Sequence, residues 1–414
     1  MCNDLINRLV DEVTVNFFTE LAEPLKYKKL TFNFDVYLKY EPQIFKMRKV
    51  LIVGGGLSGL VAANLLTKCA EVILIEKKQY PFHRVCGEYI SNETVPFLQQ
   101  HGLLPNLAAL PNIKTLWLTS VNGRKATLAL DLGGFGISRY TLDHFLFQQA
   151  VRNGVQVFQN CEATSVNFSS DRFLIETTEK NFEADVVMGA FGKRSRLDKA
   201  MNRPFIQKKS PYVGVKYHIR THHPNEVIAL HNFKDGYCGL SNVEDGKSTL
   251  CYLTHRNNLK EHKQIEAMER TVLHKNPYLK EIFSTAEFLY EKPETINEIL
   301  FETKAAVENH VLMCGDAAGM ITPLCGNGMA LAIHSAKVAA ERITDFVEGK
   351  ISRAELEQQY EQKWNQLFAR RLWAGRQIQN LFGSEWTSDL AVNLARYTPS
   401  IAGWLVKQTH GKPF

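Results

Sequence analysis

The chain has 414 residues, a formal net charge of +6, and hydrophobic and charged contents of 45% and 22%. These values are those of an ordinary globular protein with a large core and two or more domains. No apolar run reaches the roughly 18–20 residues of a membrane span, and no dense Lys/Arg tract with interleaved aromatics supports a nucleic-acid partner. The mild positive charge suits a dinucleotide, an anionic substrate or an anionic membrane surface without selecting among them.

The eight cysteines are scattered along the chain, and no C-x-x-C pair occurs. This spacing argues against a zinc site, and no metal is predicted. With no secretory signal in the sequence, the cysteine usage favours a reduced, cytoplasmic setting. Peripheral contact with a membrane is compatible with these observations.

Residues 1–46 differ in pattern from the rest of the chain. Apolar residues recur every four positions from Leu5 to Leu21, as in a helix, and then alternate with polar residues from Leu30 to Leu38, as in a strand. Two interpretations are open: a packed helix–strand extension, or a mis-called leader upstream of a true start at Met47. We favour the second, because dinucleotide domains of this kind usually begin at the strand that follows Met47.

The stretch from Lys49 to Glu76 carries the first signature. A buried strand over 50–53, glycines spaced G-x-G-x-x-G, a helix over 57–67 and a second strand over 72–75 form a βαβ pattern. In such a unit the glycines allow a tight turn, the helix N-terminus faces a pyrophosphate, and an acid about 20 residues further on bonds a ribose. A glycine-rich turn without a ligand is the competing interpretation. The pattern predicts a dinucleotide site on Gly54, Gly56, Leu57, Ser58, Gly59, Glu76 and Lys77.

Turn signals and hydrophobic periodicity predict the elements that follow. In chain order they are a loop over 77–89, a helix over 91–101, a hairpin over 114–129 turning at Asn122-Gly123, a glycine-rich link over 133–136, a helix over 139–153, and short strands over 155–158, 164–168, 173–177 and 186–189. They continue with an antiparallel sheet over 211–255, which turns at Asp235-Gly236 and Asp245-Gly246, and a polar helix over 260–275.

The stretch from Val311 to Met329 carries a second signature. A buried strand over 311–314 stops at Gly315-Asp316, and an apolar helix runs from Gly328 to Phe346. The acid is placed to bond a sugar-like chain, and the positive end of the helix suits an isoalloxazine, whose N1/O2 edge is negative when reduced. The alternative is a strand–turn–helix segment that has no role in catalysis. The predicted contacts are Gly315, Asp316, Pro323, Gly326, Asn327, Gly328 and Met329.

Together these two stretches resemble the FAD-binding motifs of the flavoprotein monooxygenase and geranylgeranyl reductase superfamily, built like para-hydroxybenzoate hydroxylase. The similarity covers residues 49 to about 347. CGE at 86–88 and GDAAG-x-x-x-P-x-x-G-x-G at 315–328 look closest to the geranylgeranyl reductase branch. The resemblance implies FAD as the cofactor, Asp316 on its ribityl chain, and the R-x-x-x-D pair Arg139 and Asp143 nearby.

The middle motif departs from the superfamily pattern. The superfamily has G-A-D-G-x-x-S where this chain has GAFGKRS at 189–195, with Phe191 in place of the acid. In the hydroxylases this acid supports both FAD and the nicotinamide donor, so its loss weakens the case for NADPH docking in their manner. The external donor is left open among NADPH, NADH and a protein reductant. Halogenases share the fold, but their W-x-W-x-I-P segment is absent.

The loop before residue 89 holds the candidate reactive groups, Cys86 and Glu88. Cys86 is either a redox or substrate-lining thiol or, as we favour, a small packing residue. Cys325, beside the second turn, has the same alternatives. Glu88 either bonds the flavin, acts as an acid whose pKa rises on burial, or begins the next helix.

Arg84 is a further candidate in the same loop. With His83 it either contacts the pyrophosphate, because a guanidinium fork suits phosphate oxygens, or forms a solvated basic pair. No histidine is predicted to be catalytic. The histidines expected on the surface or in the sheet are His218, His222, His223 and His231.

The tail from Ala354 is predicted to be helical. Apolar residues alternate there with arginines, namely Phe368, Leu372, Ile378 and Leu381 with Arg370, Arg371 and Arg376. The pattern fits a basic amphipathic face for a membrane or a lipophilic substrate entrance. We favour a helix packed on the FAD domain with its arginines in water.

The predicted fold is α/β, with a doubly wound, Rossmann-like FAD-binding domain over 47–116, 139–200 and 301–348. An antiparallel substrate domain over 117–138 and 201–300 is inserted in it, and 349–414 form a helical tail. The predicted function is FAD-dependent reduction of C=C bonds in a lipophilic isoprenoid or polyketide substrate, as in geranylgeranyl reductases. The alternatives are hydroxylation of an aromatic or quinone-like substrate and flavin binding without turnover.

Overall fold

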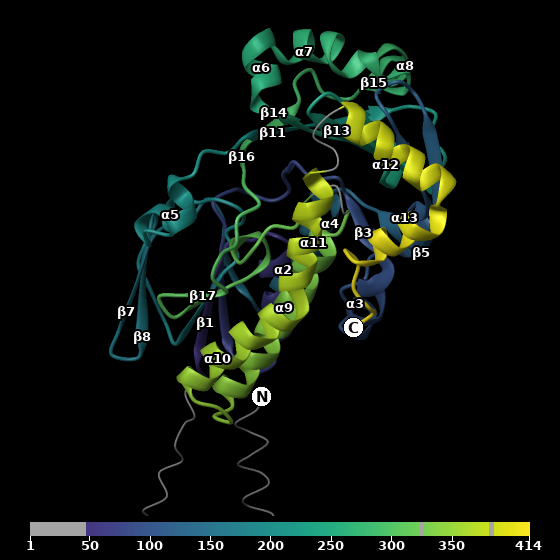
Figure 1. The fold of residues 1–414 in the computed structure, drawn as a ribbon. Helices are drawn as coiled ribbons and strands as arrows, with labels where there is room; N and C mark the ends of the chain where they lie inside the picture. Colours follow the sequence, from purple (N-terminus) through teal and green to yellow (C-terminus); the bar gives the residue numbers. More distant parts are fainter. Residues whose placement is uncertain (1–46, 323–325, 381–384) are drawn as a thin grey trace, which may run out of the picture. The chain divides into compact units, whose positions relative to one another are not determined.

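The computed structural model describes residues 47–322, 326–380 and 385–414 (Figure 1), and its first sheet is parallel apart from the edge strand β17. Neighbouring strands follow the order β17-β18-β10-β1-β2-β6. They are β1 Lys49–Val53, β2 Glu71–Ile75, β6 Gln156–Phe158, β10 Val186–Gly189, β17 Val307–Glu308 and β18 Val311–Met313. The chain order runs outward from β1 in both directions, so the sheet is doubly wound and its switch point lies between β1 and β10. Ligands bind such sheets at the carboxyl ends of the strands beside this point.

Helices cover the parallel sheet because its strands are apolar on both faces. Leu51 and Ile52 are fully buried, as expected for a central parallel strand. The helices packed with them are α2 Leu57–Leu66, α4 Arg139–Arg152 and α9 Gly328–Val347, all at the predicted places. The predicted strands over 164–168 and 173–177 are β7 Ala163–Ser169 and β8 Arg172–Thr177, and with β9 Phe182–Ala184, which was not predicted, they form a meander that leads back to β10.

A second, largely antiparallel sheet has the order β15-β11-β14-β13-β12-β4-β5-β3, with β16 also paired to β11. Its strands are β3 Tyr89–Ser91, β4 Asn112–Thr119, β5 Lys125–Gly136, β11 Tyr212–Arg220, β12 Val227–Phe233, β13 Gly236–Asn242, β14 Ser248–His255, β15 Glu287–Phe288 and β16 Glu294–Ile299. The predicted turns at Asp235-Gly236 and Asp245-Gly246 join β12 to β13 and β13 to β14.

Helices also cover both faces of this second sheet. One face packs on α6 Arg256–His262, α7 Ile265–Thr271 and α8 Pro277–Thr285. The other packs on the end of the chain, α12 Glu385–Tyr397 and α13 Pro399–Lys407. Among the described helices, none is both long and apolar enough to cross a lipid bilayer.

Two predicted elements differ in the structure. The glycine-rich link over 133–136 is part of β5 and pairs with β3. The glycines are needed there because a methyl group at Gly134 would lie 2.4 Å from the carbonyl oxygen of Ile90. The polar helix over 260–275 is broken into α6 and α7, because Lys263 has a left-handed φ of 62°.

The tail is helical as predicted, and it packs on the FAD domain before it reaches the second sheet. Its first helices are α10 Arg353–Trp364 and α11 Arg370–Asn380. Phe368 and Leu372 are buried, and Arg371 is paired with the buried Glu93 at 3.0 Å. Phe368 and Leu372 therefore pack inward, as we expected, whereas the expectation that the arginines lie in water is wrong for Arg371, because Glu93 pairs with it inside the protein. Leu381 lies outside the described residues.

Glu269 on α7 is a buried carboxyl group that should make folding depend on pH. Its Oε1 accepts hydrogen bonds from the hydroxyls of Tyr217 at 2.9 Å and Tyr252 at 2.7 Å. Burial raises its pKa to about 7, against the opposing effect of these hydrogen bonds. Because the folded pKa lies above the unfolded value, the contribution to stability is present below the unfolded pKa and is lost as the pH rises through about 7.

Glu269→Gln keeps an oxygen that can accept both hydrogen bonds but cannot ionise. We expect the free energy of unfolding of the natural protein to fall by about 3 kcal/mol more than that of the variant between pH 5 and pH 8. Urea denaturation at the two pH values measures the difference. Equal changes in both proteins would show that Glu269 titrates normally.

Candidate functional site

A cavity of about 680 Å³ lies where the carboxyl ends of β1, β2 and β10 meet the second sheet. Its polar end is lined by both predicted glycine turns and its other end by aliphatic side chains. The predicted residues that line it are Gly54, Gly56, Leu57, Ser58, Glu76, Lys77, Arg84, Cys86, Glu88, Arg139, Asp316, Gly326, Gly328 and Met329. Pro323 and Cys325 lie outside the described residues.

The first turn shows why each glycine of the motif is needed. Gly54 has a φ of +103°, and a methyl group on Gly59 would lie 2.0 Å from the Gly54 carbonyl oxygen. These two glycines therefore let the turn pack against α2. At Gly56 a Cβ would meet nothing closer than 3.9 Å. The space before the first N–H groups of α2 is open, and such a helix end attracts an anion.

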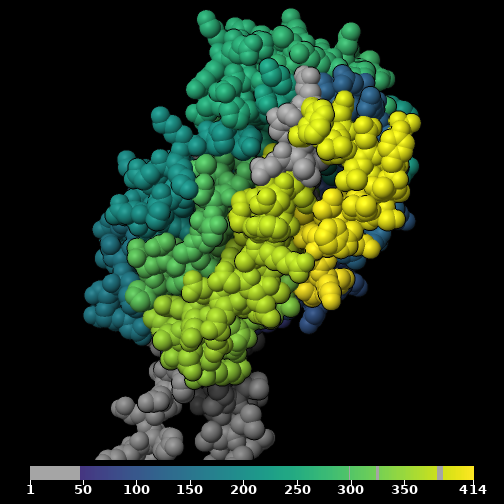
Figure 2. Space-filling view, viewed as in Figure 1, coloured from purple at the N-terminus to yellow at the C-terminus, as the bar shows by residue number. Residues whose placement is uncertain are grey.

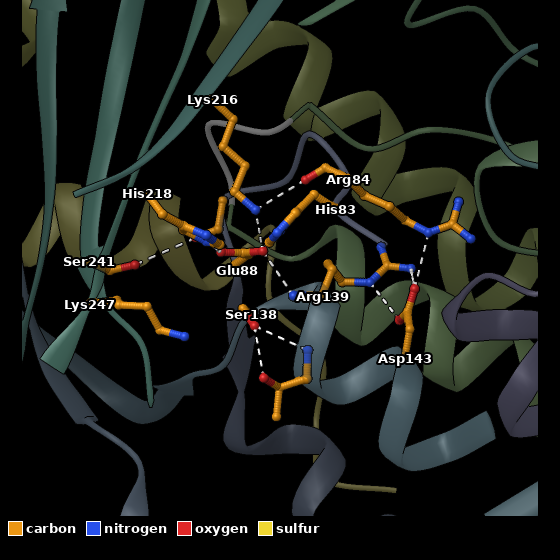
Figure 3. Close-up of polar contacts among 12 residues, drawn as sticks. His83, Arg84, Glu88, Ser138, Arg139, Asp143, Lys216, His218, Ser241 and Lys247 are labelled. Carbon is orange, nitrogen blue, oxygen red and sulfur yellow. Dashed lines mark hydrogen bonds and ion pairs between the residues drawn. The ribbon is translucent and has the colours of Figure 1, made fainter. Parts of the chain in front are cut away.

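Two guanidinium groups are fixed beside this open space (Figure 3). Arg139 binds Asp143 through two bonds of 2.8 and 2.7 Å, and Arg84 donates to the same carboxylate at 3.0 Å. Arg84 also reaches Glu76 at 3.2 Å. Glu76 in turn accepts the Gly55 N–H at 2.9 Å. The predicted acid, the arginines and the glycine turn thus form one hydrogen-bonded wall.

The second turn adjoins the first, although the two are far apart in the sequence. Gly315 has a φ of +59°, and a methyl group there would lie 2.8 Å from the Ser58 hydroxyl of α2. Asp316 faces the cavity, and α9 begins at Gly328 beside it. Asn327 is instead fully buried, and its amide donates to the Thr409 carbonyl at 2.8 Å. The side chain of Asn327 therefore holds the C-terminal segment.

Glu88 lies between the two sheets and is fully buried (Figure 3). Its carboxylate pairs with Lys216, accepts the Arg139 N–H at 2.8 Å and lies 2.6 Å from His218 Nε2. Burial raises the pKa of Glu88, but the Lys216 ammonium and the His218 hydrogen bond outweigh it, so the pKa is lowered. The predicted rise of this pKa on burial is therefore wrong, because burial brought the Lys216 ammonium and the His218 ring to the same carboxylate. Cys86, two residues earlier, is half-buried and also faces the cavity.

Lys216 and His218 were not predicted as site residues. They lie two residues apart on β11, so their side chains point to the same face of this strand. All residues of β11 except those at its two ends are buried. The sequence signal that could have revealed them is a pair of charged or polar residues at alternate positions of an otherwise apolar strand. His218 is in the sheet, as expected, but it is a partner of the site residue Glu88.

The apolar end of the cavity is built from the second sheet and the last two helices. Its wall is continuous with the polar end and combines residues from segments far apart in the sequence. They include Leu116, Leu118, Leu128, Leu130, Ile228, Leu230, Leu253, Leu390, Leu394 and Leu405. The polar end could hold a dinucleotide and the apolar end a long hydrocarbon chain.

Known proteins share both the sequence pattern and the fold. A digeranylgeranylglycerophospholipid reductase from Methanosarcina acetivorans is 25% identical over 77% of this chain and 80% of its own. A tryptophan 2-halogenase from Chondromyces crocatus is 22% identical over 80% of this chain and 67% of its own. The structure of a geranylgeranyl bacteriochlorophyll reductase-like protein from Thermoplasma acidophilum superposes with a TM-score of 0.72 and 18% identity, covering 89% of this chain and 96% of that chain.

The FAD binding domain family model matches residues 47–372, which include both glycine turns and every strand of the second sheet. The fold is therefore that of the predicted FAD-binding superfamily, and the relatives include both reductases and halogenases. The chain belongs to the FAD binding domain family and is an FAD-dependent enzyme of the oxidoreductase, monooxygenase and halogenase group.

Proposed function

We propose that this protein reduces carbon–carbon double bonds in a long-chain isoprenoid lipid. The observation that carries the proposal is a continuous cavity that joins the dinucleotide turns to an aliphatic compartment. When bound and reduced, FAD supplies the hydride. Each double bond then gains one hydride and one proton, and one flavin is oxidised. Reductases of geranylgeranyl lipids among the relatives support this substrate class.

In this proposal the chain's own residues hold the cofactor along the polar wall. The open space at Gly56 receives the pyrophosphate, and Arg84 and Arg139 offset its charge. Glu76 would bond the adenosine ribose, and Asp316 would bond the ribityl chain. Gly326, Gly328 and Met329 line the same cavity and would hold the ring. The external electron donor is a nicotinamide nucleotide or a protein reductant.

The aliphatic compartment excludes water and orients the substrate chain. Its aliphatic lining buries the apolar surface of the substrate chain. This burial contributes roughly 25 cal/mol of favourable binding free energy for each Å² of apolar surface removed from water. Leu390 and Leu394 of α12 line the compartment and are also 53% and 37% exposed, so they form its rim. A long chain can enter there while a polar headgroup stays outside.

We further propose that the outer surface of α12 and α13 docks on an anionic lipid surface (Figure 2). Trp386 and Tyr397 are each 74% exposed, and Trp404 is 57% exposed. Tryptophan and tyrosine rings prefer the lipid interface. The exposed Arg396 provides a cation on the same helices, and Lys407 lies on this surface in an ion pair with Asp131 at 2.6 Å. This surface continues into the rim of the cavity, so a docked protein would take its substrate directly from the membrane.

Gly56→Val tests the cofactor site. The new side chain would point into the open space before α2, so it should block the pyrophosphate while costing only about 1 kcal/mol of stability at this helix start. We expect the affinity for FAD to fall at least about 100-fold, measured by quenching of flavin fluorescence. Gly403→Val on α13 is the control, because a Cβ there meets nothing within 4 Å. Normal FAD binding by Gly56→Val would place the pyrophosphate elsewhere.

The requirement for oxygen distinguishes the proposed reaction, which needs none, from hydroxylation and halogenation. The FAD-loaded protein is reduced with dithionite and mixed, without oxygen, with a lipid that carries geranylgeranyl chains. We expect the oxidised flavin spectrum to return within one turnover and mass spectrometry to show two added hydrogens per flavin. Product formed from an aromatic ring only after oxygen is admitted would instead establish a monooxygenase.

Vesicle co-sedimentation tests the docking surface. The combined substitution of Trp386, Tyr397 and Trp404 by Ser should abolish binding of the full chain to phosphatidylglycerol vesicles. Leu174→Ser is the matched control, since Leu174 lies on β8 and is 41% exposed. A dimer that dissociates in the triple variant, with vesicle binding unchanged, would assign the surface to a second copy of the chain.

A further inference from the structure

A chain of hydrogen bonds leads from the buried Glu88 to solvent. Glu88 Oε2 lies 2.6 Å from His218 Nε2, and His218 Nδ1 lies 3.3 Å from the Tyr290 hydroxyl. The same hydroxyl lies 3.0 Å from His83 Nε2. Tyr290, between β15 and β16, is 38% exposed. Three segments that are distant in the sequence thus contribute to one connected path.

The two ends of this path differ in their surroundings. Glu88 is fully buried and lines the cavity, whereas Lys216 and His218 lie behind the cavity wall. His83 is half-buried at the rim, where Tyr140 stacks on it with ring centres 4.6 Å apart. Solvent can therefore meet the path at Tyr290 and His83, and a bound substrate can meet it at Glu88.

The atoms along the path can alternate as donor and acceptor. His218 donates from Nε2 to the Glu88 carboxylate and accepts the Tyr290 hydroxyl proton at Nδ1, and Tyr290 accepts from His83 Nε2. A neutral imidazole offers one donor and one acceptor, so each histidine can pass a proton from one nitrogen to the other. A merely structural ion pair between Glu88 and Lys216 would need neither Tyr290 nor His83.

We propose that His83, Tyr290 and His218 relay a proton from solvent to Glu88, which gives it to the substrate carbon beside the one that receives the hydride. This inference rests on the proposed double-bond reduction, which consumes one proton for each hydride. The His218 Nε2 proton passes to the Glu88 carboxylate, and the new O–H bond breaks as the C–H bond forms, so Glu88 is again a carboxylate after the step. The Tyr290 hydroxyl proton then passes to His218 Nδ1, the His83 Nε2 proton passes to Tyr290, and water reprotonates His83 and leaves hydroxide in solvent, so atoms and charge balance after every turnover.

Other charged groups face the path and set its operating range. Burial lowers the pKa of His83, and Lys216 and His218 lower it further, whereas Glu88 and Glu294 raise it. Burial raises the pKa of Tyr290, with Lys247 opposing it and Glu88, Tyr140 and Glu244 adding to it. Burial raises the pKa of Glu88, but Lys216 and His218 lower it more, so the resting group is a carboxylate that takes its proton from the relay during the reaction.

Tyr290→Phe tests the relay because it removes one oxygen from a partly exposed side chain. We expect FAD affinity to be unchanged and the rate of double-bond reduction to fall at least tenfold at pH 8, with a smaller loss at pH 6, where solvent supplies protons more readily. Tyr140→Phe is the matched control, since that ring also contacts His83 but its hydroxyl has no hydrogen bond among the described residues.

A second measurement needs neither cofactor nor substrate. In the full chain labelled with ¹⁵N-histidine, Tyr290→Phe should shift the His218 Nδ1 resonance, while Tyr140→Phe should leave it in place. An unshifted resonance, or a Tyr290→Phe enzyme with the natural rate and pH profile, would overturn the relay. An absence of turnover in the natural protein, with the resonance shift intact, would instead overturn the double-bond reduction and leave the hydrogen-bonded path standing.

Discussion

The close approach of two glycine turns is the constraint on which the rest of the structure depends. Gly54 and Gly59 bring β1 against α2, and Gly315 brings the end of β18 against Ser58 of the same helix. No side chain fits at these contacts, and two of the three glycines also have positive φ values. The approach leaves the ends of α2 and α9 facing one cavity, where an extended cofactor can meet both.

Buried charges then fix the wall of that cavity. Asp143 is held by Arg84 and Arg139, and Glu88 by Lys216 and His218. Buried ion pairs contribute little net stability, because desolvation offsets their attraction, but loss of one partner costs about 3–5 kcal/mol. Their main effect here is positional. Glu88 ties the loop after β2, the start of α4 and strand β11 to one another, so the two sheets keep a fixed relation at the site.

The apolar half of the cavity has a different origin. It is formed by β4, β5 and β12 of the second sheet and closed by α12 and α13 from the end of the chain. These helices bury residues such as Val392 and Ala402 while Trp386 and Tyr397 stay exposed. One pair of helices therefore serves both as a wall for a hydrocarbon chain and as an aromatic outer surface, which links the proposed lipid substrate to the membrane that would supply it.

The sequence by itself determined the elements whose signals are local. The βαβ unit around Gly54, the turn at Gly315, the hairpin turns and the apolar helix from Gly328 follow from periodicity and from the needs of glycine backbones, so they appear where predicted. The family could be recognised for the same reason, because its motifs are these local glycine turns. The break at Lys263 and the path of β5 through Gly133–Gly136 were not, because neighbouring strands and helices decided them.

Only the tertiary structure decided the direction in which the pKa of Glu88 is shifted. Its partners Lys216 and His218 lie 128 and 130 residues away in the chain, and they reverse the pKa shift that burial alone would produce. The inward packing of Phe368 and Leu372, and the exposure of Trp386 and Tyr397, were settled in the same way. Local patterns record which groups a backbone segment can present, whereas charge pairing and solvent exposure depend on what distant segments bring to the same place.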